Sequence, residues 1–124
     1  MRSALRCVDR NGLWAGNATK NPEPSWDADV VTAMVKGNSK GFAHEFALKG
    51  GDAQSGTLTK IYEGGRPKGY SPMKKQGAII LGIGGDNSNG AVGTWFEGVM
   101  ASGYTSDATD DALQANIVAA GYGS

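Results

Sequence analysis

Apolar and polar residues alternate, or apolar residues run together in short blocks, along five stretches of the 124-residue chain. Alternation with a period of two is typical of a strand with one buried face, whereas a continuous apolar block suits a strand buried on both faces. Most of these stretches end at glycine, asparagine or proline, which favour turns. The pattern therefore predicts strands at residues 30–36, 42–49, 57–63, 78–83 and 94–101.

The boundaries and pairing of these strands follow from the residues around them. Gly50 and Gly51 are expected to end the second strand, because glycine weakens a strand interior. The last two strands flank a short polar loop and are expected to pair antiparallel, with Trp95, Val99 and Met100 as core residues. Residues 5–8 form the one candidate strand near the start of the chain.

Residues 106–121 carry a helical pattern instead. Ser106 and the acids that follow it suit a helix N-terminus, where free backbone N–H groups accept a capping oxygen and favour negative charge. Leu113, Ile117 and Ala120 fall on one helical face, and Gly121 is placed to end the helix in a left-handed conformation. We expect one C-terminal helix.

Strands without alternating helices exclude a parallel α/β fold. The order predicts an all-β architecture, part of a β-sandwich, with the C-terminal helix lying on it. Antiparallel sandwiches commonly use about seven strands or more, so the chain has too few to close one. We therefore expect further strands from an N-terminal segment that precedes this sequence.

Composition narrows the possible partners. Lys plus Arg and Asp plus Glu each number 12, which gives a net charge of zero and no electrostatic attraction to nucleic acid or an anionic membrane. A neutral sugar is compatible with this balance. Cys7 is the only cysteine, which excludes a disulfide within the chain. The first residues lack the apolar core of a signal peptide, and no stretch has the length of a membrane span.

The strongest candidate site is the loop Gly-Ile-Gly-Gly-Asp-Asn-Ser-Asn-Gly at residues 82–90. Its glycines allow close backbone approach to a ligand, and Asp86 at the end of an apolar strand has the chemistry of a general acid. The residue types alone favour an ordinary turn, because Asp and Asn cap turns. Calcium is disfavoured because the loop offers too few side-chain ligands at the required spacing.

Other candidates are weaker. Glu97 is expected to share a strand face with Trp95 and to hold a sugar ring or lie at a sheet edge. Asp9 precedes an Asn-Gly turn and fits a turn acid. His44 has no second histidine or cysteine with which to bind a metal, so no metal site is predicted. Trp14 and Trp26 flank a polar loop, where they either stack on sugars or anchor the loop.

The sequence around that loop resembles a known family. The run Gly-Ile-Gly-Gly-Asp-Asn-Ser-Asn-Gly-Ala-Val-Gly-Thr-Trp-Phe-Glu-Gly-Val-Met at residues 82–100, with matching stretches at 11–16, 31–37 and 50–56, is similar to the catalytic domain of α-L-arabinofuranosidase B, glycoside hydrolase family 54. The resemblance implies a concanavalin-like jelly-roll β-sandwich. It also implies a retaining hydrolase that removes terminal arabinofuranosyl groups from arabinoxylan or arabinan side chains, without a cofactor.

The resemblance assigns roles residue by residue. Asp86 takes the position of the acid/base carboxylate, and Gly85, Asn87 and Asn11 take substrate-binding positions. A retaining glycosidase also needs a nucleophilic carboxylate ~5–5.5 Å from the acid/base. The matching position here holds Arg10, which cannot attack an anomeric carbon. The neighbouring carboxylate, Asp9, is a substitute only if the local register shifts, because adjacent strand residues point to opposite faces.

The resemblance also sets expectations for the whole chain. Residues 1–124 correspond to the C-terminal half of one catalytic domain. The N-terminal half of that domain and the family's arabinose-binding module have no counterpart. The implied partner is an arabinose-containing polysaccharide or oligosaccharide, and members of the family are typically secreted. A non-catalytic carbohydrate-binding or structural β-sandwich is the alternative, which Arg10 favours.

Overall fold

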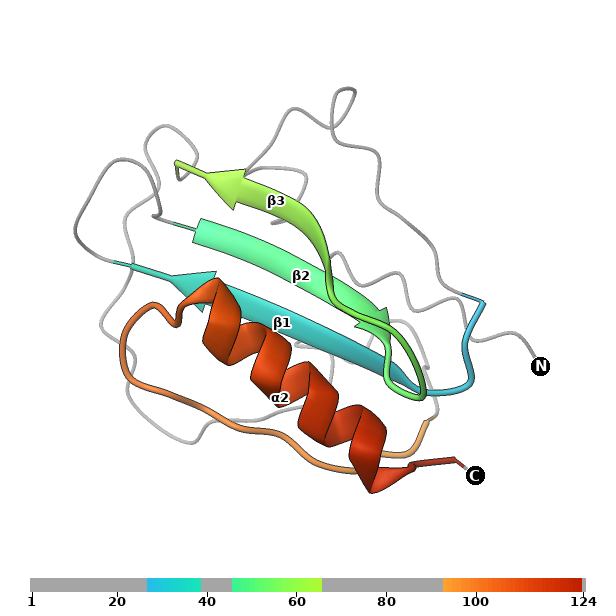
Figure 1. Ribbon diagram of the computed structural model, residues 1–124. Helices are drawn as coiled ribbons and strands as arrows, with labels where there is room; N and C mark the ends of the chain where they lie inside the picture. The colour runs from blue at the N-terminus through green and yellow to red at the C-terminus, as the bar shows by residue number, and fades with distance from the viewer. Residues whose placement is uncertain (1–26, 39–45, 66–92, 124) are drawn as a thin grey trace.

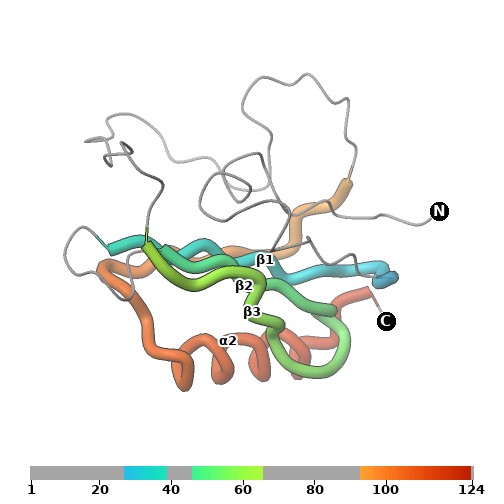
Figure 2. Tube along the Cα trace, turned by 90° about the horizontal axis from the view of Figure 1, so that it is seen from above, coloured from blue at the N-terminus to red at the C-terminus, as the bar shows by residue number. Residues whose placement is uncertain are grey.

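The described part of the chain forms two layers, a sheet and a helix (Figure 1). A computed structural model describes residues 27–38, 46–65 and 93–123. Three strands, β1 (Val31–Gly37), β2 (Phe46–Asp52) and β3 (Thr59–Gly64), form an antiparallel sheet in the order β1-β2-β3. The helix α2 (Asp107–Ala120) lies against one face of this sheet, as the view from above shows (Figure 2).

Three of the predicted strands are confirmed, with shifted ends. The strand predicted at 30–36 is β1, that at 57–63 is β3, and the second half of that at 42–49 begins β2. A register shift between Leu48 and Lys49 in the β2–β3 pair places an extra residue in β3. The candidate strands at 5–8 and 78–83 lie outside the described residues, as do 42–45.

The expectation that Gly50 and Gly51 end the second strand is wrong. Both lie inside β2, where they pair with Ala33 and Thr32 of β1. Glycine is required at position 51 because the backbone of Thr57 approaches it closely. A Cβ at this position would lie 3.0 Å from the backbone oxygen of Thr57.

The turn after β2 is formed by its last residue instead. The Asp52 carboxylate accepts a hydrogen bond of 2.7 Å from the Gln54 backbone N–H and one of 3.1 Å from the Ser55 hydroxyl. Short-range bonding of this kind is how aspartate initiates turns. Gly56 then takes a φ of 77°.

The strand predicted at residues 94–101 is not formed. Residues 93–101 are irregular, and Trp95, Val99 and Met100 are 54%, 63% and 54% exposed rather than in the core. The described residues contain no strand paired with this segment, and its expected partner at 78–83 lies outside them. Without a paired strand, alternation alone does not bury these side chains.

The helix is confirmed, with both ends as predicted. The Ser106 hydroxyl accepts a hydrogen bond from the Thr109 backbone N–H at 3.2 Å, and Gly121 closes the helix at φ 70° with its N–H bonded to the Val118 carbonyl oxygen. Its expected apolar face is only partly buried: Leu113 and Ile117 are half-buried and Ala120 is exposed.

The architecture is therefore mostly β with one C-terminal helix, as expected. Ala47, Leu48 and Ala53 are the buried apolar residues of the described part. The only fully buried helix residues are polar, Asp110 and Gln114. Among the described residues, no helix combines the length and apolar character needed to cross a membrane.

Candidate functional site

The residues that the sequence assigns to the catalytic site lie outside the described ranges. These are Asp9, Arg10, Asn11, Gly85, Asp86 and Asn87. The same holds for Cys7, Trp14, Trp26 and His44. Their roles therefore stay predictions.

Glu97 is the one weaker candidate that the structure describes. Its carboxylate accepts a hydrogen bond of 2.8 Å from the Tyr122 hydroxyl, which raises the pKa of that phenol. The rings of Phe96 and Tyr122 lie 5.0 Å apart, within the range of favourable aromatic pairs. Glu97 does not lie on a strand with Trp95, so the predicted face is absent. In the described structure Glu97 ties residues 96–97 to the end of the chain.

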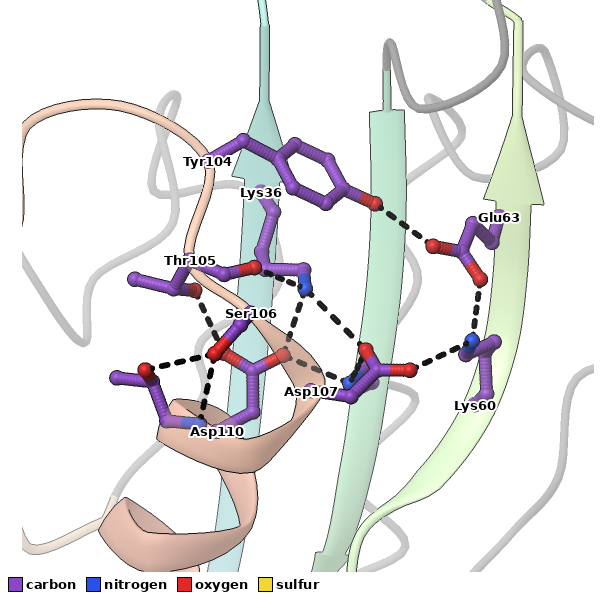
Figure 3. Close-up of polar contacts among 10 residues, drawn as sticks. Lys36, Lys60, Glu63, Tyr104, Thr105, Ser106, Asp107 and Asp110 are labelled. Atoms are coloured by element: carbon purple, nitrogen blue, oxygen red, sulfur yellow. Dashed lines mark hydrogen bonds and ion pairs between the residues drawn. The ribbon is translucent and has the colours of Figure 1, made fainter.

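A buried ionic cluster between the sheet and α2 was missed by the sequence reasoning (Figure 3). At its centre is Asp110, which is 1% exposed. Asp110 Oδ2 accepts hydrogen bonds from Lys36 Nζ at 2.6 Å and Lys49 Nζ at 2.7 Å, and Oδ1 accepts one from Thr105 Oγ1 at 2.6 Å. One carboxylate of the helix is thus held by two strands and the preceding loop.

A second carboxylate of the first helical turn extends the cluster to β3. Asp107 Oδ1 accepts a hydrogen bond from Lys49 Nζ at 2.6 Å, and Oδ2 accepts one from Lys60 Nζ at 3.3 Å. Lys60 also pairs with Glu63, the next carboxylate along the edge strand. Asp107 and Asp110, three residues apart, lie on the same side of the helix and therefore meet the same face of the sheet.

Tyr104, which lies in the loop before α2, contacts both Glu63 and Lys36 of the cluster. The Tyr104 hydroxyl donates to Glu63 Oε1 at 3.1 Å, and Lys36 Nζ lies 4.2 Å from the centre of the Tyr104 ring. This distance suits a cation–π contact. Lys36 also donates to the Thr105 carbonyl oxygen at 2.9 Å.

The cluster keeps its groups ionised. Burial disfavours the charged form of Asp110, but hydrogen bonds from Lys36, Lys49 and Thr105 outweigh it and lower the pKa of Asp110. Burial likewise opposes the charge on Lys49, yet its bonds to Asp107 and Asp110 hold the pKa of Lys49 above its usual value. The hydrogen bond from Lys49, followed by that from Lys60, lowers the pKa of Asp107.

These shifts exclude acid/base work by the cluster near neutral pH. A general acid needs a pKa near the working pH, and the pKa values of Asp110 and Asp107 move away from neutrality. Lysine acts as a nucleophile only when its pKa falls, whereas that of Lys49 rises. Burial together with the bond to Glu63 raises the pKa of Tyr104 to about 12. The cluster is a structural clamp.

The middle of α2 and the residues after it are held by neutral hydrogen bonds. Gln114 Nε2 donates to the Asp52 carbonyl oxygen at 2.7 Å, and Gln54 Nε2 donates to the Tyr122 carbonyl oxygen at 3.1 Å. Both bonds join the helix end of the chain to the β2–β3 turn. Polar contacts therefore anchor the first turn of α2, its middle, and the residues that follow it.

A groove of about 290 Å³ runs beside the edge strand β1. Its walls come from β1, from the segment before the helix, and from α2: Met34, Val35, Lys36, Gly37, Val99, Ala101, Gly103, Thr105, Thr109, Asp110 and Leu113. Within the described residues, no group of three or more histidine, cysteine, aspartate or glutamate side chains is arranged to hold a metal ion.

Comparison with known proteins identifies the family. The sequence profile of the family described as "Alpha-L-arabinofuranosidase B, catalytic" matches residues 8–123, nearly the whole chain. The chain belongs to the α-L-arabinofuranosidase B catalytic family.

Curated relatives of this arabinofuranosidase family are much longer than the chain. The alpha-L-arabinofuranosidase of Hypocrea jecorina is 55% identical over 116 residues, which cover 90% of this chain and 22% of the relative. The alpha-L-arabinofuranosidase B of Aspergillus oryzae is 54% identical with the same coverage. The chain thus spans about a fifth of the length of these relatives.

Solved arabinofuranosidase structures share the fold of the described part. One is an arabinofuranosidase complexed with arabinofuranosyl-alpha-1,2-xylobiose, with a TM-score of 0.66 and 55% identity. Another is a variant of a GH54 a-l-arabinofuranosidase soaked with 4-nitrophenyl a-l-arabinofuranoside, with the same TM-score and identity. Each similarity covers 80% of this chain and 20% of the solved chain.

Proposed function

We propose that this chain contributes the acid/base half of an active site that hydrolyses terminal α-L-arabinofuranosyl groups. The observation that carries the proposal is the family match over residues 8–123, which spans the Asp86 loop. The substrates of this chemistry are arabinoxylan or arabinan side chains, and the reaction belongs to hemicellulose degradation. Residues 1–124 then form part of one jelly-roll β-sandwich catalytic domain.

The proposed chemistry uses one carboxylate of this chain in two steps. Asp86 protonates the glycosidic oxygen as it leaves, and then removes a proton from the water that attacks the intermediate. Gly85, Asn87 and Asn11 contact the arabinose.

The residue at the nucleophile position does not fit the proposed reaction. Arg10 stands where the family resemblance expects a glutamate, and a guanidinium cannot form the glycosyl–enzyme bond. Loss of a nucleophile costs many orders of magnitude in rate. We therefore expect the chain alone to hydrolyse slowly at best, with Asp9 as the only neighbouring substitute.

Release of nitrophenol from 4-nitrophenyl α-L-arabinofuranoside tests the proposal. Arg10→Glu restores a carboxylate at the nucleophile position, so it should raise the rate at least about 100-fold above the unmodified chain. Adding Asp86→Asn to that variant should remove the gain, whereas Asp111→Asn, an exposed helix position, should not. Failure of Arg10→Glu to exceed its Asp86→Asn double variant refutes the hydrolase proposal.

Whether Asp9 acts as a substitute nucleophile is tested in the chain that retains Arg10. If residual hydrolysis is measured, Asp9→Asn should abolish it; hydrolysis that survives this change rules out Asp9 as the substitute nucleophile.

Arg10 also supports a second candidate, carbohydrate binding without turnover. Such a module retains Asn11 and the Asp86 loop as sugar contacts while lacking a nucleophile. Calorimetric titration with arabino-oligosaccharides should then give a saturable signal that Asn11→Ala weakens. A flat titration excludes the binding module.

A further inference from the structure

Two oxygen atoms buried between the sheet and α2 have no hydrogen-bond partner among the described residues. They are Thr32 Oγ1 of β1 and Gln114 Oε1 of α2. Nearly all buried polar groups in native proteins are paired, either with protein atoms or with ordered water. An unpaired buried oxygen costs the free energy of removing it from water, so two of them in one interface point to a shared partner.

Both side chains lie in the layer between the sheet and the helix. Lys36 points toward α2, where it binds Asp110. Thr32 comes four residues before Lys36 in a strand whose register is continuous, so it faces α2 as well. Gln114 follows Asp110 by four residues along the helix and is 1% exposed, so it faces the sheet.

The pairing of β1 with β2 brings the amide of Gln114 to the level of Thr32. Gln114 Nε2 donates to the Asp52 carbonyl oxygen at 2.7 Å. Asp52 pairs with Val31, and the residue before Asp52, Gly51, pairs with Thr32. The Gln114 amide therefore reaches the sheet within one residue pair of Thr32.

The partner of this amide fixes its orientation. A carbonyl oxygen only accepts hydrogen bonds, so the NH₂ group of Gln114 must face Asp52, and Oε1 is left as the acceptor on the other side. The Thr32 hydroxyl can both donate and accept. A direct bond between Thr32 and Gln114 would satisfy both groups, but the structure does not form it. Water is the molecule that is small enough for a closed interface and able to bond both oxygens.

We propose that one ordered water molecule is bound between β1 and α2, where it accepts a hydrogen bond from the Thr32 hydroxyl and donates one to Gln114 Oε1. A buried water commonly makes about three hydrogen bonds. The third partner is the backbone oxygen of Thr57, which lies beside Gly51, the cross-strand neighbour of Thr32. The water joins the start of β1 to the middle of α2, whereas Lys36 joins the end of β1 to the first turn. This role is independent of any hydrolase activity.

Replacing the Thr32 hydroxyl by a methyl group gives opposite results with and without the water. Thr32→Val deprives the water of one partner, so it should destabilise the chain. If the hydroxyl were simply unpaired, the same change would remove a buried unsatisfied group and stabilise the chain. Thr59→Val, at an exposed strand position, is the matched control for placing valine in a strand. We expect Thr32→Val to melt at least about 4 °C below Thr59→Val.

The dependence on Gln114 is a second measurement. In a Gln114→Leu background the water has already lost its helix partner, so the difference between Thr32→Val and Thr59→Val should fall to less than about half. A difference of unchanged size would mean that Thr32 and Gln114 share no partner, and it overturns the proposal. The same holds if Thr32→Val melts at or above the temperature of Thr59→Val in the chain that retains Gln114.

Crystallography of the chain at high resolution locates the water directly. The expected result is one electron-density peak within about 3.2 Å of both Thr32 Oγ1 and Gln114 Oε1. A direct bond between these two oxygens, or a protein group in the bridging position, overturns the proposal. If the isolated chain shows no cooperative melting transition, the same variants are compared in a hybrid in which residues 8–123 replace the matched stretch of the Hypocrea jecorina relative, with the same outcomes deciding.

Discussion

Replacing Asp110 by asparagine tests whether the ionic clamp holds α2 to the sheet. The Asn side chain has nearly the same shape and is still able to bond Thr105, but it removes the negative charge between Lys36 and Lys49. Both ammonium groups lie within 2.7 Å of Asp110 Oδ2, and both lysine side chains are only 4% exposed. The variant therefore leaves buried positive charge with one fewer partner.

The cost follows from burial. Removal of one partner from a buried ion pair destabilises a protein by about 3–5 kcal/mol. Asp107 Oδ1 still lies 2.6 Å from Lys49 and 3.6 Å from Lys36, so we expect the lower end, about 3 kcal/mol. For a domain of this size, that loss lowers the melting temperature by about 10 °C.

Urea unfolding at pH 7, monitored by circular dichroism at the helix band, measures this loss of stability. Asp111→Asn is the matched control, because it removes the same charge from the adjacent, exposed helix position and should change stability by less than about 0.5 kcal/mol. Equal unfolding midpoints for Asp110→Asn and Asp111→Asn would refute the clamp. A double-mutant cycle with Lys36→Met should also give a coupling energy above about 1 kcal/mol.

The same carboxylate predicts a loss of stability in acid. The pKa of Asp110 is lower in the folded chain than in the unfolded chain, because Lys36, Lys49 and Thr105 bond to its ionised form. Its contribution is therefore complete above the unfolded value of about 4 and is lost as the pH falls below it. The stability of Asp110→Asn should depend less on pH in this range than that of the unmodified chain.

Three further predictions concern the ends of α2 and its preceding loop. The pKa of Tyr104 is raised to about 12, so its contribution to stability is present below pH ~10 and is lost as the pH rises. Tyr104→Phe should remove one phenol that ionises near pH 12 from an absorbance titration. Ser106→Ala removes the cap on Thr109 and should cost about 1 kcal/mol by urea unfolding, with Ser106→Asp as a neutral control. Gly121→Ala forces a side chain into φ 70° and should cost about 1 kcal/mol, whereas Gly121→Asn should cost less.

The sequence predicted the elements whose signals are local. Both helix caps were found because Ser106 and Gly121 act on backbone groups within a few residues of themselves. The strands β1 and β3 followed from alternation over six or seven residues. The end of β2 was missed because the role of Gly51 depends on its approach to Thr57, a contact made only after the chain turns back.

The ionic clamp was not predictable in the same way. Lys36 and Lys49 lie 74 and 61 residues from Asp110 along the chain, and single lysines in strands look like solvated residues. Their burial is decided by where α2 packs. One signal was present: Asp107 and Asp110 share a helical face, a spacing that was attributed to the helix dipole alone. The catalytic assignments at Asp86 and Arg10 rest on family resemblance and stay predictions.

The clamp is complete within the described residues, with carboxylates and ammonium groups paired between α2 and all three strands. Asp110→Asn should therefore destabilise the isolated chain and also a single-chain hybrid in which residues 8–123 replace the matched stretch of the Hypocrea jecorina relative. Urea unfolding of both proteins measures the two losses. A loss confined to the hybrid would mean that the clamp forms only when the remainder of the domain is present, and the argument that α2 and the sheet hold each other would then fail.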